Sequence, residues 1–243
     1  MRTFFLLVGR ELAAVFYSVW TYILLAAVAA LTAWWFQEAL LHANFEMSTA
    51  LLTIYGWIFW LAFLLAPLLT MRLFVDEKRS GSLELLMTAP VSDTGVVLSK
   101  LAGATITFAA FLAPLWIIFG VLAFAFGAKP DWGQLSSFTL GFLLLGEVFL
   151  AFGLLASALG STHLYAALLA MLGGSVLILP GSVVQLVDPE SRLRRVLDYL
   201  DLEGQLRTAA VGLIDVRHVV LQATLSALFV FWTIRVVEAR RWL

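Results

Sequence analysis

Long apolar stretches between charged residues constrain this chain more than any other feature. A helix that crosses a bilayer needs about 20 predominantly apolar residues, and its backbone must satisfy its own hydrogen bonds there. Six stretches meet that length, the last being the shortest: Glu11 to Glu38, Glu46 to Arg72, Lys100 to Lys129, two stretches between Asp131 and Asp188 on either side of Gly160–His163, and about Arg217–Arg235. We therefore expect six transmembrane helices.

The composition supports a membrane protein and excludes several other classes. Hydrophobic residues make up 62% of the 243 residues and charged residues 13%, against roughly 45–50% and about 25% in soluble globular proteins. A formal net charge of −1 excludes nucleic-acid binding, and the absence of cysteine excludes disulfides, thiolate metal sites and cysteine nucleophiles. The predicted fold class is an all-α polytopic membrane protein, with residues 1–243 forming a single transmembrane domain.

We expect residues 1–18 to form an interfacial helix and not a signal peptide. Glu11 interrupts the basic segment that a signal peptide requires, and the apolar run continues past a possible cleavage site. In an interfacial helix the charged side chains would face water and the apolar ones the acyl boundary. The charged residues are Arg2, Arg10 and Glu11, and the apolar ones are Phe5, Leu12 and Phe16.

The distribution of charges predicts the orientation of the chain. With both termini in the cytoplasm, the inner side holds nine basic and six acidic residues, and the outer side holds six basic and nine acidic residues. Cytoplasmic loops of membrane proteins carry an excess of lysine and arginine. Both termini are therefore expected to be cytoplasmic, together with the loop at residues 72–100.

The inner loop at residues 72–100 is long enough to hold a short helix at Leu83–Thr88. The residues that predict it are Gly81, which can end the preceding helix in a left-handed conformation, the cap Ser82, Glu84 in the first turn, the helix-stopping Pro90, and Ser92 as the cap of the next helix. Its leucines would be costly to expose, so we interpret the short helix as a docking surface. The alternative is a hairpin tip that only keeps the loop soluble.

Residues 71–103, MRLFVDEKRSGSLELLMTAPVSDTGVVLSKLAG, resemble the signature of ABC-2-type transporter permeases. The resemblance is strongest to the gliding-motility-associated permease branch. It extends to Gly9-Arg10-Glu11 with Tyr17 and Tyr22, to VGLIDVRHVV before the last span, and to the terminal EARRWL.

This resemblance implies a six-helix permease that assembles with a second permease, either a copy or a paralogue, and with two ABC ATPase subunits. It places the chain in a bacterial or archaeal cytoplasmic (inner) membrane. It also implies that the inner loop holds a coupling helix that inserts into the ATPase. The residues assigned to ATPase coupling are Asp76, Glu77, Lys78, Gly81, Leu83, Glu84, Leu85 and Pro90.

The chain is not expected to be an enzyme or to bind ATP itself. Its only lysines are Lys78, Lys100 and Lys129, and none lies in a G-x-x-x-x-G-K-[ST] motif. ATP and Mg²⁺ would therefore be bound by the partner ATPase, and no cofactor is expected in this chain.

The outer loop at residues 184–216 is the second segment predicted to hold structure. Pro180-Gly181 is expected to break the fifth helix near its outer end, since proline lacks a backbone donor. The following segment, SRLRRVLDYLDLEGQL, has apolar residues near helical spacing with charges between them. Two interpretations stay open: surface or re-entrant helices like those before the last span of ABC-2 permeases, or an amphipathic connector that only seals the bundle.

Glu147 is the one acidic residue within a predicted span. A carboxylate at that depth is expected to be neutral, paired or beside water. It is a candidate for the translocation path, and the alternative is a protonated carboxyl that bonds a neighbouring helix through, for example, a tryptophan N–H. Gly141, Gly146 and Gly153 beside it predict close helix packing.

The function predicted is that of the permease subunit of an ATP-driven exporter, in which ATP hydrolysis elsewhere drives substrate translocation. One alternative uses the same ATPase for mechanical work on an envelope partner without transport, and another is a membrane anchor that transports nothing. A serine protease built on Ser175 and His218 is disfavoured, because a nucleophile must lie within hydrogen-bond reach of its base and these residues are expected at different depths. The sequence does not identify a substrate.

Overall fold

The computed structural model describes residues 2–81, 92–188 and 190–240, and these ranges contain helices and no strands. Six helical segments within them are long and apolar enough to cross a membrane, as the sequence predicted: Val19–His42, Met47–Ser80, Asp93–Phe126, Trp132–Leu159, His163–Val184 and Val216–Ala239. The individual helices are α1 (Arg2–Phe16), α2 (Val19–His42), α3 (Met47–Thr70), α4 (Val75–Ser80), α6 (Asp93–Ala110), α7 (Ala113–Phe126), α8 (Trp132–Leu159), α9 (His163–Val184), α10 (Arg192–Leu200), α11 (Leu202–Ala210) and α12 (Val216–Arg240).

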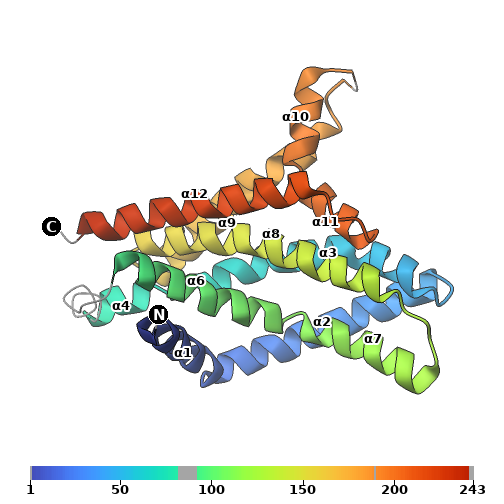
Figure 1. Ribbon diagram of the computed structural model, residues 1–243, viewed down its shortest axis with the longest axis horizontal. Coiled ribbons are helices and arrows are strands. Elements are labelled where there is room, and N and C mark those ends of the chain that lie inside the picture. Colours follow the sequence, from blue (N-terminus) through green and yellow to red (C-terminus); the bar gives the residue numbers. More distant parts are fainter. Residues whose placement is uncertain (1, 82–91, 189, 241–243) are drawn as a thin grey trace.

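The long helices form a bundle with α8 and α3 at its centre. Within the most apolar 18-residue stretch of each span, 67% of the residues are buried in α8 and 56% in the segment that contains α3. The corresponding share is 17% in both α2 and α12. The outer helices therefore present most of their apolar side chains to the surroundings, as expected for a lipid-facing surface. Figure 1 shows α1, α4 and the end of α12 at one end of the bundle, called the α4 end here. The turn from α2 to α3 and the connection from α7 to α8 lie at the far end.

The helix boundaries predicted around the inner loop are confirmed where the structure describes them. Gly81 has a φ of 72° and ends α4 in the left-handed region, where residues other than glycine are strained. Ser92 caps α6, because its side-chain oxygen accepts a hydrogen bond from the Gly95 N–H at 3.2 Å. The predicted short helix at Leu83–Thr88 lies outside the described residues.

Proline has different effects in the third and fifth spans. The third span is interrupted between α6 and α7, and Pro114 lies in the first turn of α7, where its missing N–H needs no partner. The predicted break of the fifth span at Pro180-Gly181 is wrong, since α9 continues through Pro180 to Val184. A transmembrane helix can accept a proline where neighbouring groups compensate for the lost bond. Gly181 instead allows the Asp201 side chain to approach α9, because a Cβ there would collide with it.

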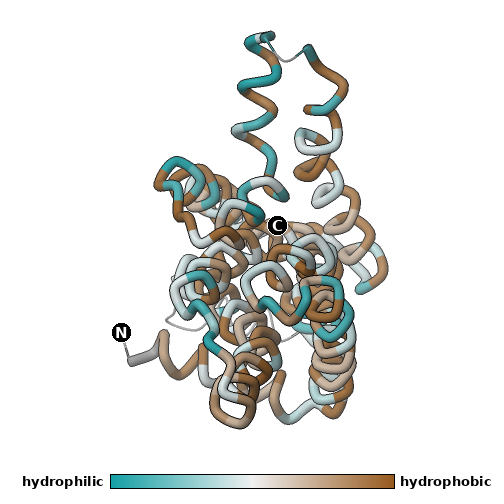
Figure 2. The backbone as a smooth tube through the Cα atoms, turned by 90° about the vertical axis from the view of Figure 1, so that its right-hand side faces the viewer, coloured by the Kyte–Doolittle hydropathy of each residue, from teal (hydrophilic) through white to brown (hydrophobic). Residues whose placement is uncertain are grey.

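The outer loop forms two helices with different environments. Helix α10 has no buried residue and, with the end of α9, projects from the side of the bundle as an arm (Figures 1 and 2). Helix α11 folds back against α8 and buries Leu202, Gln205, Leu206, Ala209 and Ala210. Two side chains of α8 hold its end: Gln134 Nε2 donates to the Ala210 carbonyl at 2.7 Å, and Ser137 Oγ donates to the Ala209 carbonyl at 2.8 Å. The α11 part of the loop is therefore packed against the bundle, whereas α10 is not.

Close helix packing at the glycines of α8 is confirmed. A Cβ at Gly141 would lie 2.5 Å from the Ala209 Cβ in α11, and a Cβ at Gly146 or Gly153 would collide with Phe108 or Thr70. These glycines therefore let α11, α6 and α3 approach the central helix.

Candidate functional site

The short helix α4 is the meeting point of several parts of the bundle. It follows α3 directly, and Gly81 at its end precedes the loop at residues 82–91. Its consecutive residues Asp76, Glu77 and Lys78 contact different elements of the bundle. These three residues and their partners are called the α4 junction here: Arg10 and Glu11 of α1, Lys100 of α6, His163 of α9, and the end of α8 at residues 157–160.

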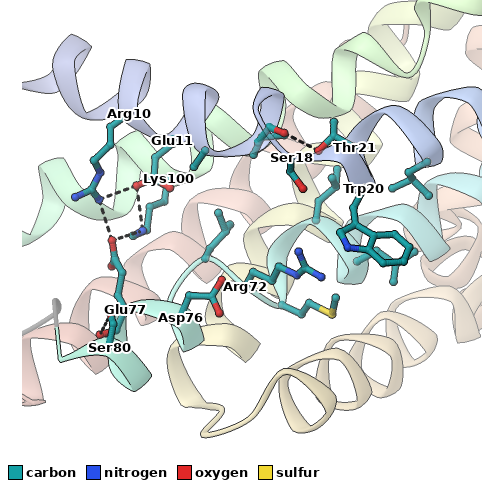
Figure 3. A pocket seen from close by; sticks show the side chains of 17 residues that line it. Arg10, Glu11, Ser18, Trp20, Thr21, Arg72, Asp76, Glu77, Ser80 and Lys100 are labelled. Atoms are coloured by element: carbon teal, nitrogen blue, oxygen red, sulfur yellow. Dashed lines mark hydrogen bonds and ion pairs between the residues drawn. The ribbon is translucent and has the colours of Figure 1, made fainter.

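Glu77 connects α4 to α1 and α6 through a compact set of charges. Its Oε1 lies 2.8 Å from Arg10 Nη2 and 2.8 Å from Lys100 Nζ. The Oε1 of Glu11 lies 2.8 Å from the same arginine nitrogen and 3.2 Å from the same lysine nitrogen. Figure 3 shows the four side chains converging from three helices. Two cations and two carboxylates therefore neutralise each other within the junction.

Lys100 is the buried member of this set. Its side chain is only 2% exposed, and its Nζ lies 5.3 Å from the centroid of the Phe74 ring. A buried ammonium group is destabilising unless it is paired, because it has lost its hydration. Glu11 and Glu77 supply the pairing, and the aromatic ring adds a cation–π contact. The position of Lys100 therefore depends on α1 and α4 being in place.

Arg10 lies at the rim of the junction, with its side chain 48% exposed. Burial lowers the pKa of this guanidinium, but the hydrogen bonds and charges of Glu11 and Glu77 outweigh burial and raise it above its ordinary value. Arg10 therefore remains charged and pairs with both carboxylates.

Lys78 connects α4 to the end of α8. Its Nζ donates to the carbonyl oxygens of Ser157 (3.1 Å), Gly160 (2.8 Å) and Ala158. The last carbonyls of a helix have no partner within the helix, and they carry the negative end of its dipole. One ammonium group therefore caps the central helix of the bundle.

Asp76 and Phe74 connect α4 to the turn between α8 and α9. Asp76 Oδ1 lies 2.6 Å from His163 Nε2 at the first residue of α9. The Phe74 N–H donates to Ser157 Oγ at 3.1 Å. The base of the loop at residues 82–91 is thus attached to α1, α6, α8 and α9 at once. A displacement of α4 would have to move these helices or break buried polar contacts.

The structure brings together only some of the residues that the sequence assigned to coupling. Asp76, Glu77 and Lys78 lie in the junction, and Gly81 ends α4. Leu83, Glu84, Leu85 and Pro90 lie outside the described residues.

Sequence reasoning missed the partners of α4. The prediction that Glu11 faces water is wrong, because its side chain is 11% exposed and turned toward α6. Gly103 makes room for it, since a Cβ at that position would lie 2.9 Å from the Glu11 Cβ. Lys100 marked only the end of an apolar stretch, and His163 only a polar break between two spans. Lys100 could have indicated such a partner, because a lysine close to the apolar part of a span needs a buried group to pair with.

Glu147 lies away from the junction, between α8 and α6. Thr105 Oγ1 of α6 lies 2.6 Å from Glu147 Oε2, and the same hydroxyl lies 2.9 Å from the Leu101 carbonyl. The partner is therefore a threonine and not a tryptophan. Its role in a translocation path stays a prediction.

Two other candidate chemistries receive no support from the geometry of the described residues. Ser175 Oγ donates to the Met171 carbonyl of its own helix at 2.8 Å, and no hydrogen bond joins it to His218. Among the residues that the structure describes, no three His, Cys, Asp or Glu side chains form a group that could hold a metal ion.

Comparison with known proteins identifies the family. No curated protein matches the chain. The sequence profile described as "ABC-2 family transporter protein" matches residues 39–201, which is about two thirds of the chain and includes α3, α4 and the complete central helix α8. The chain therefore belongs to the ABC-2 transporter family, whose members are transmembrane permease components.

Proposed function

We propose that this chain is the permease subunit of an ATP-driven exporter and that a separate ABC ATPase docks on the loop at residues 82–91. The observation that carries the proposal is the α4 junction. The residues next to this loop hold α4 to α1, α6, α8 and α9 through ion pairs and helix-capping bonds. A force applied to the loop by an ATPase would therefore reach most of the bundle directly.

In this proposal the chain forms the translocation path and changes conformation, and the ATPase binds and hydrolyses ATP. None of the three lysines lies in a phosphate-binding loop motif, so ATP and Mg²⁺ are assigned to the partner. Closure of two ATPase subunits would move the α4 junction and the helices attached to it. Two permease halves rocking against each other would then open a path alternately to either side of the membrane.

A second permease completes the path in this proposal. The arm formed by the end of α9 and α10 projects from the bundle (Figure 1), and its apolar residues have little to contact within one chain. Leu186, Leu193 and Val196 are 85%, 59% and 54% exposed. A partner permease, whether a copy or a paralogue, would cover part of this surface.

The orientation follows from the same proposal. An ATPase that uses cellular ATP works in the cytoplasm, so the α4 end faces the cytoplasm, with both termini on that side. The charge distribution supports this, because the α4 side carries nine of the fifteen basic residues. The membrane is the cytoplasmic membrane of a bacterium or archaeon.

A photo-crosslinking experiment tests the proposal. A photoreactive amino acid at Leu86 should crosslink the full chain to an ATPase in native membranes, whereas the same group at Leu213, at the far end, should not. The purified complex should hydrolyse ATP and transport substrate in vesicles. Equal crosslinking from both positions, or none from Leu86, would contradict the docking site. ATP hydrolysis that drives no transport would instead support mechanical work on an envelope partner.

A further inference from the structure

A cleft of about 660 Å³ lies beside the α4 junction and has no role in the proposed function. It is formed by α1, the start of α2, the end of α3 and α4 (Figure 3). Sites that hold small organic molecules typically enclose roughly 300–1,000 Å³. The cleft is large enough to hold part of an amphipathic molecule.

The lining of the cleft changes from charged to apolar along its length. Near α4 it is lined by the charged residues of the junction and by Arg72, and towards the middle of the bundle by Leu24, Leu68 and Leu69. Trp20, one helical turn before Leu24 in α2, also lines the cleft. A molecule with one polar end and one apolar end would match this gradient.

Among the cations that line the cleft, Arg72 is the one without an ion pair to a described residue. Arg10 and Lys100 are paired with Glu11 and Glu77. The Arg72 side chain has neither an ion pair nor a hydrogen bond to another of the residues in 2–81, 92–188 and 190–240. In Figure 3 its guanidinium group extends into the cleft on the side of Trp20. Guanidinium binds phosphate oxygens through two parallel N–H bonds and suits phosphate better than an ammonium group does.

The depth of these residues indicates where the polar end would lie. Arg72 follows the last residue of α3 by two positions, and Trp20 is the second residue of α2. Both therefore lie where a span leaves the apolar part of the bilayer, at the level of lipid headgroups. Tryptophan is enriched at this level in membrane proteins.

We propose that this cleft binds an anionic phospholipid of the surrounding bilayer, with its phosphate on Arg72 and an acyl chain along Leu24, Leu68 and Leu69. The apolar half of the lining favours a lipid over a free phosphate, which would leave that half empty. The lipid is a bound component of the α4 end and distinct from any transported substrate. This inference does not depend on an ATPase partner.

Native mass spectrometry of the full, delipidated chain tests the proposal. The chain is titrated separately with phosphatidylglycerol and with phosphatidylcholine, and retained lipid is counted. Phosphatidylglycerol should be retained preferentially. Arg72→Gln should weaken that retention about fivefold, the effect of roughly 1 kcal/mol expected for one basic residue at a lipid surface.

Arg79→Gln is the matched control, because Arg79 is an exposed arginine of α4 that does not line the cleft. It should retain phosphatidylglycerol like the unmodified chain. Equal losses in the two arginine variants, or equal retention of the two lipids by the unmodified chain, would overturn the proposal.

A second variant addresses the apolar half and the source of the phosphate. Leu68→Trp should fill part of the cleft and reduce retention of phosphatidylglycerol with Arg72 intact. Glycerol 3-phosphate, which has the phosphate without acyl chains, should displace the lipid only at concentrations far above that of the lipid. Displacement at equal concentration, or full retention by Leu68→Trp, would show that the site does not hold an acyl chain.

Discussion

Lys100 Nζ of α6 lies 2.8 Å from Glu77 Oε1 of α4, and this ion pair is almost completely shielded from water. It joins the third span to the short helix that precedes the loop at residues 82–91. Because Glu11 and Arg10 of α1 take part in the same set of ion pairs, α1 and α6 together fix the position of α4. The predictions below test what depends on that position.

Replacing Lys100 by methionine should destabilise the permease strongly. The variant removes the buried cation between Glu11 and Glu77, while the half-exposed Arg10 still pairs with both carboxylates. Removing one partner of a buried ion pair costs roughly 3–5 kcal/mol. Because the arginine remains, we expect the free energy of unfolding to fall by about 3 kcal/mol. Chemical unfolding in detergent measures it. Lys129→Met, at an exposed lysine, is the control and should have little effect; equal stability of the two variants would contradict a structural role for the junction.

Gly81 should tolerate asparagine better than valine. Gly81 has a φ of 72°, and no neighbour lies within 4 Å of a Cβ built on it. Substitutions at this position are therefore limited by backbone strain and not by steric collision. A left-handed conformation costs a residue such as valine about 1–2 kcal/mol and costs asparagine less. Gly81→Val should therefore shift the end of α4 and lower ATP hydrolysis by the complex, whereas Gly81→Asn should preserve it. Full activity of Gly81→Val would show that the α4 ending does not matter for coupling.

The topology can be tested with single cysteines, because the native chain has none. Ser80→Cys at the α4 end and Lys129→Cys at the far end both place a thiol at an exposed position. In intact cells an impermeant maleimide should label only the cysteine at 129, and the cysteine at 80 should react only after the membrane is opened. Labelling of both from outside would contradict the orientation and the six-span arrangement.

Glu203 at the start of α11 should make stability depend on pH. Burial, with the charge of Asp201 as the second cause, raises the pKa of this carboxyl. A carboxyl whose folded-state pKa is raised disfavours folding where it is ionised, and this penalty disappears as the pH falls through the folded-state pKa towards the unfolded value of about 4.3. Glu203→Gln should therefore raise the unfolding temperature at pH 7 and leave it unchanged near pH 4.

The control for this variant is Glu190→Gln, at an exposed glutamate of the same outer loop. It should not change the unfolding temperature at either pH. A stabilisation by Glu203→Gln that is the same at pH 7 and pH 4 would come from packing and not from the charge.

The sequence was sufficient to predict the spans and the local helix signals. The bilayer sets a minimum length for an apolar span, so charged residues such as Glu46 and Arg72 mark where the spans begin and end. Ser92 caps the helix that follows it and Gly81 ends the helix that precedes it, so both signals can be read from neighbouring residues. The partners of α4 were not predictable, because their pairing spans long separations: Glu11 and Lys100 are 89 residues apart. The packing of α11 against α8 depends in the same way on Gln134, which is 76 residues from the carbonyl it bonds. No local pattern marks such contacts.

Glu147 and Thr105 share a hydrogen-bond arrangement that allows their roles to be separated. Thr105 has one hydroxyl proton and two acceptors within reach, Glu147 Oε2 at 2.6 Å and the Leu101 carbonyl at 2.9 Å, so it can donate to only one of them at a time. A glutamine amide can donate to Thr105 Oγ1 and leave the threonine proton for Leu101. Glu147→Gln should therefore fold and assemble like the unmodified chain.

Glu147→Leu removes that donor or acceptor while Thr105 can still bond Leu101. We expect a loss of about 1 kcal/mol in the free energy of unfolding, the usual contribution of one hydrogen bond. Thr105→Val should cause a similar loss, and the double variant should lose less than the sum, because both changes break the same contact. Substrate-stimulated ATP hydrolysis by the complex should follow stability in all three variants. Normal stability of Glu147→Leu together with lost stimulation would instead assign Glu147 to a water-filled translocation path, since water would then replace the missing hydrogen-bond partner.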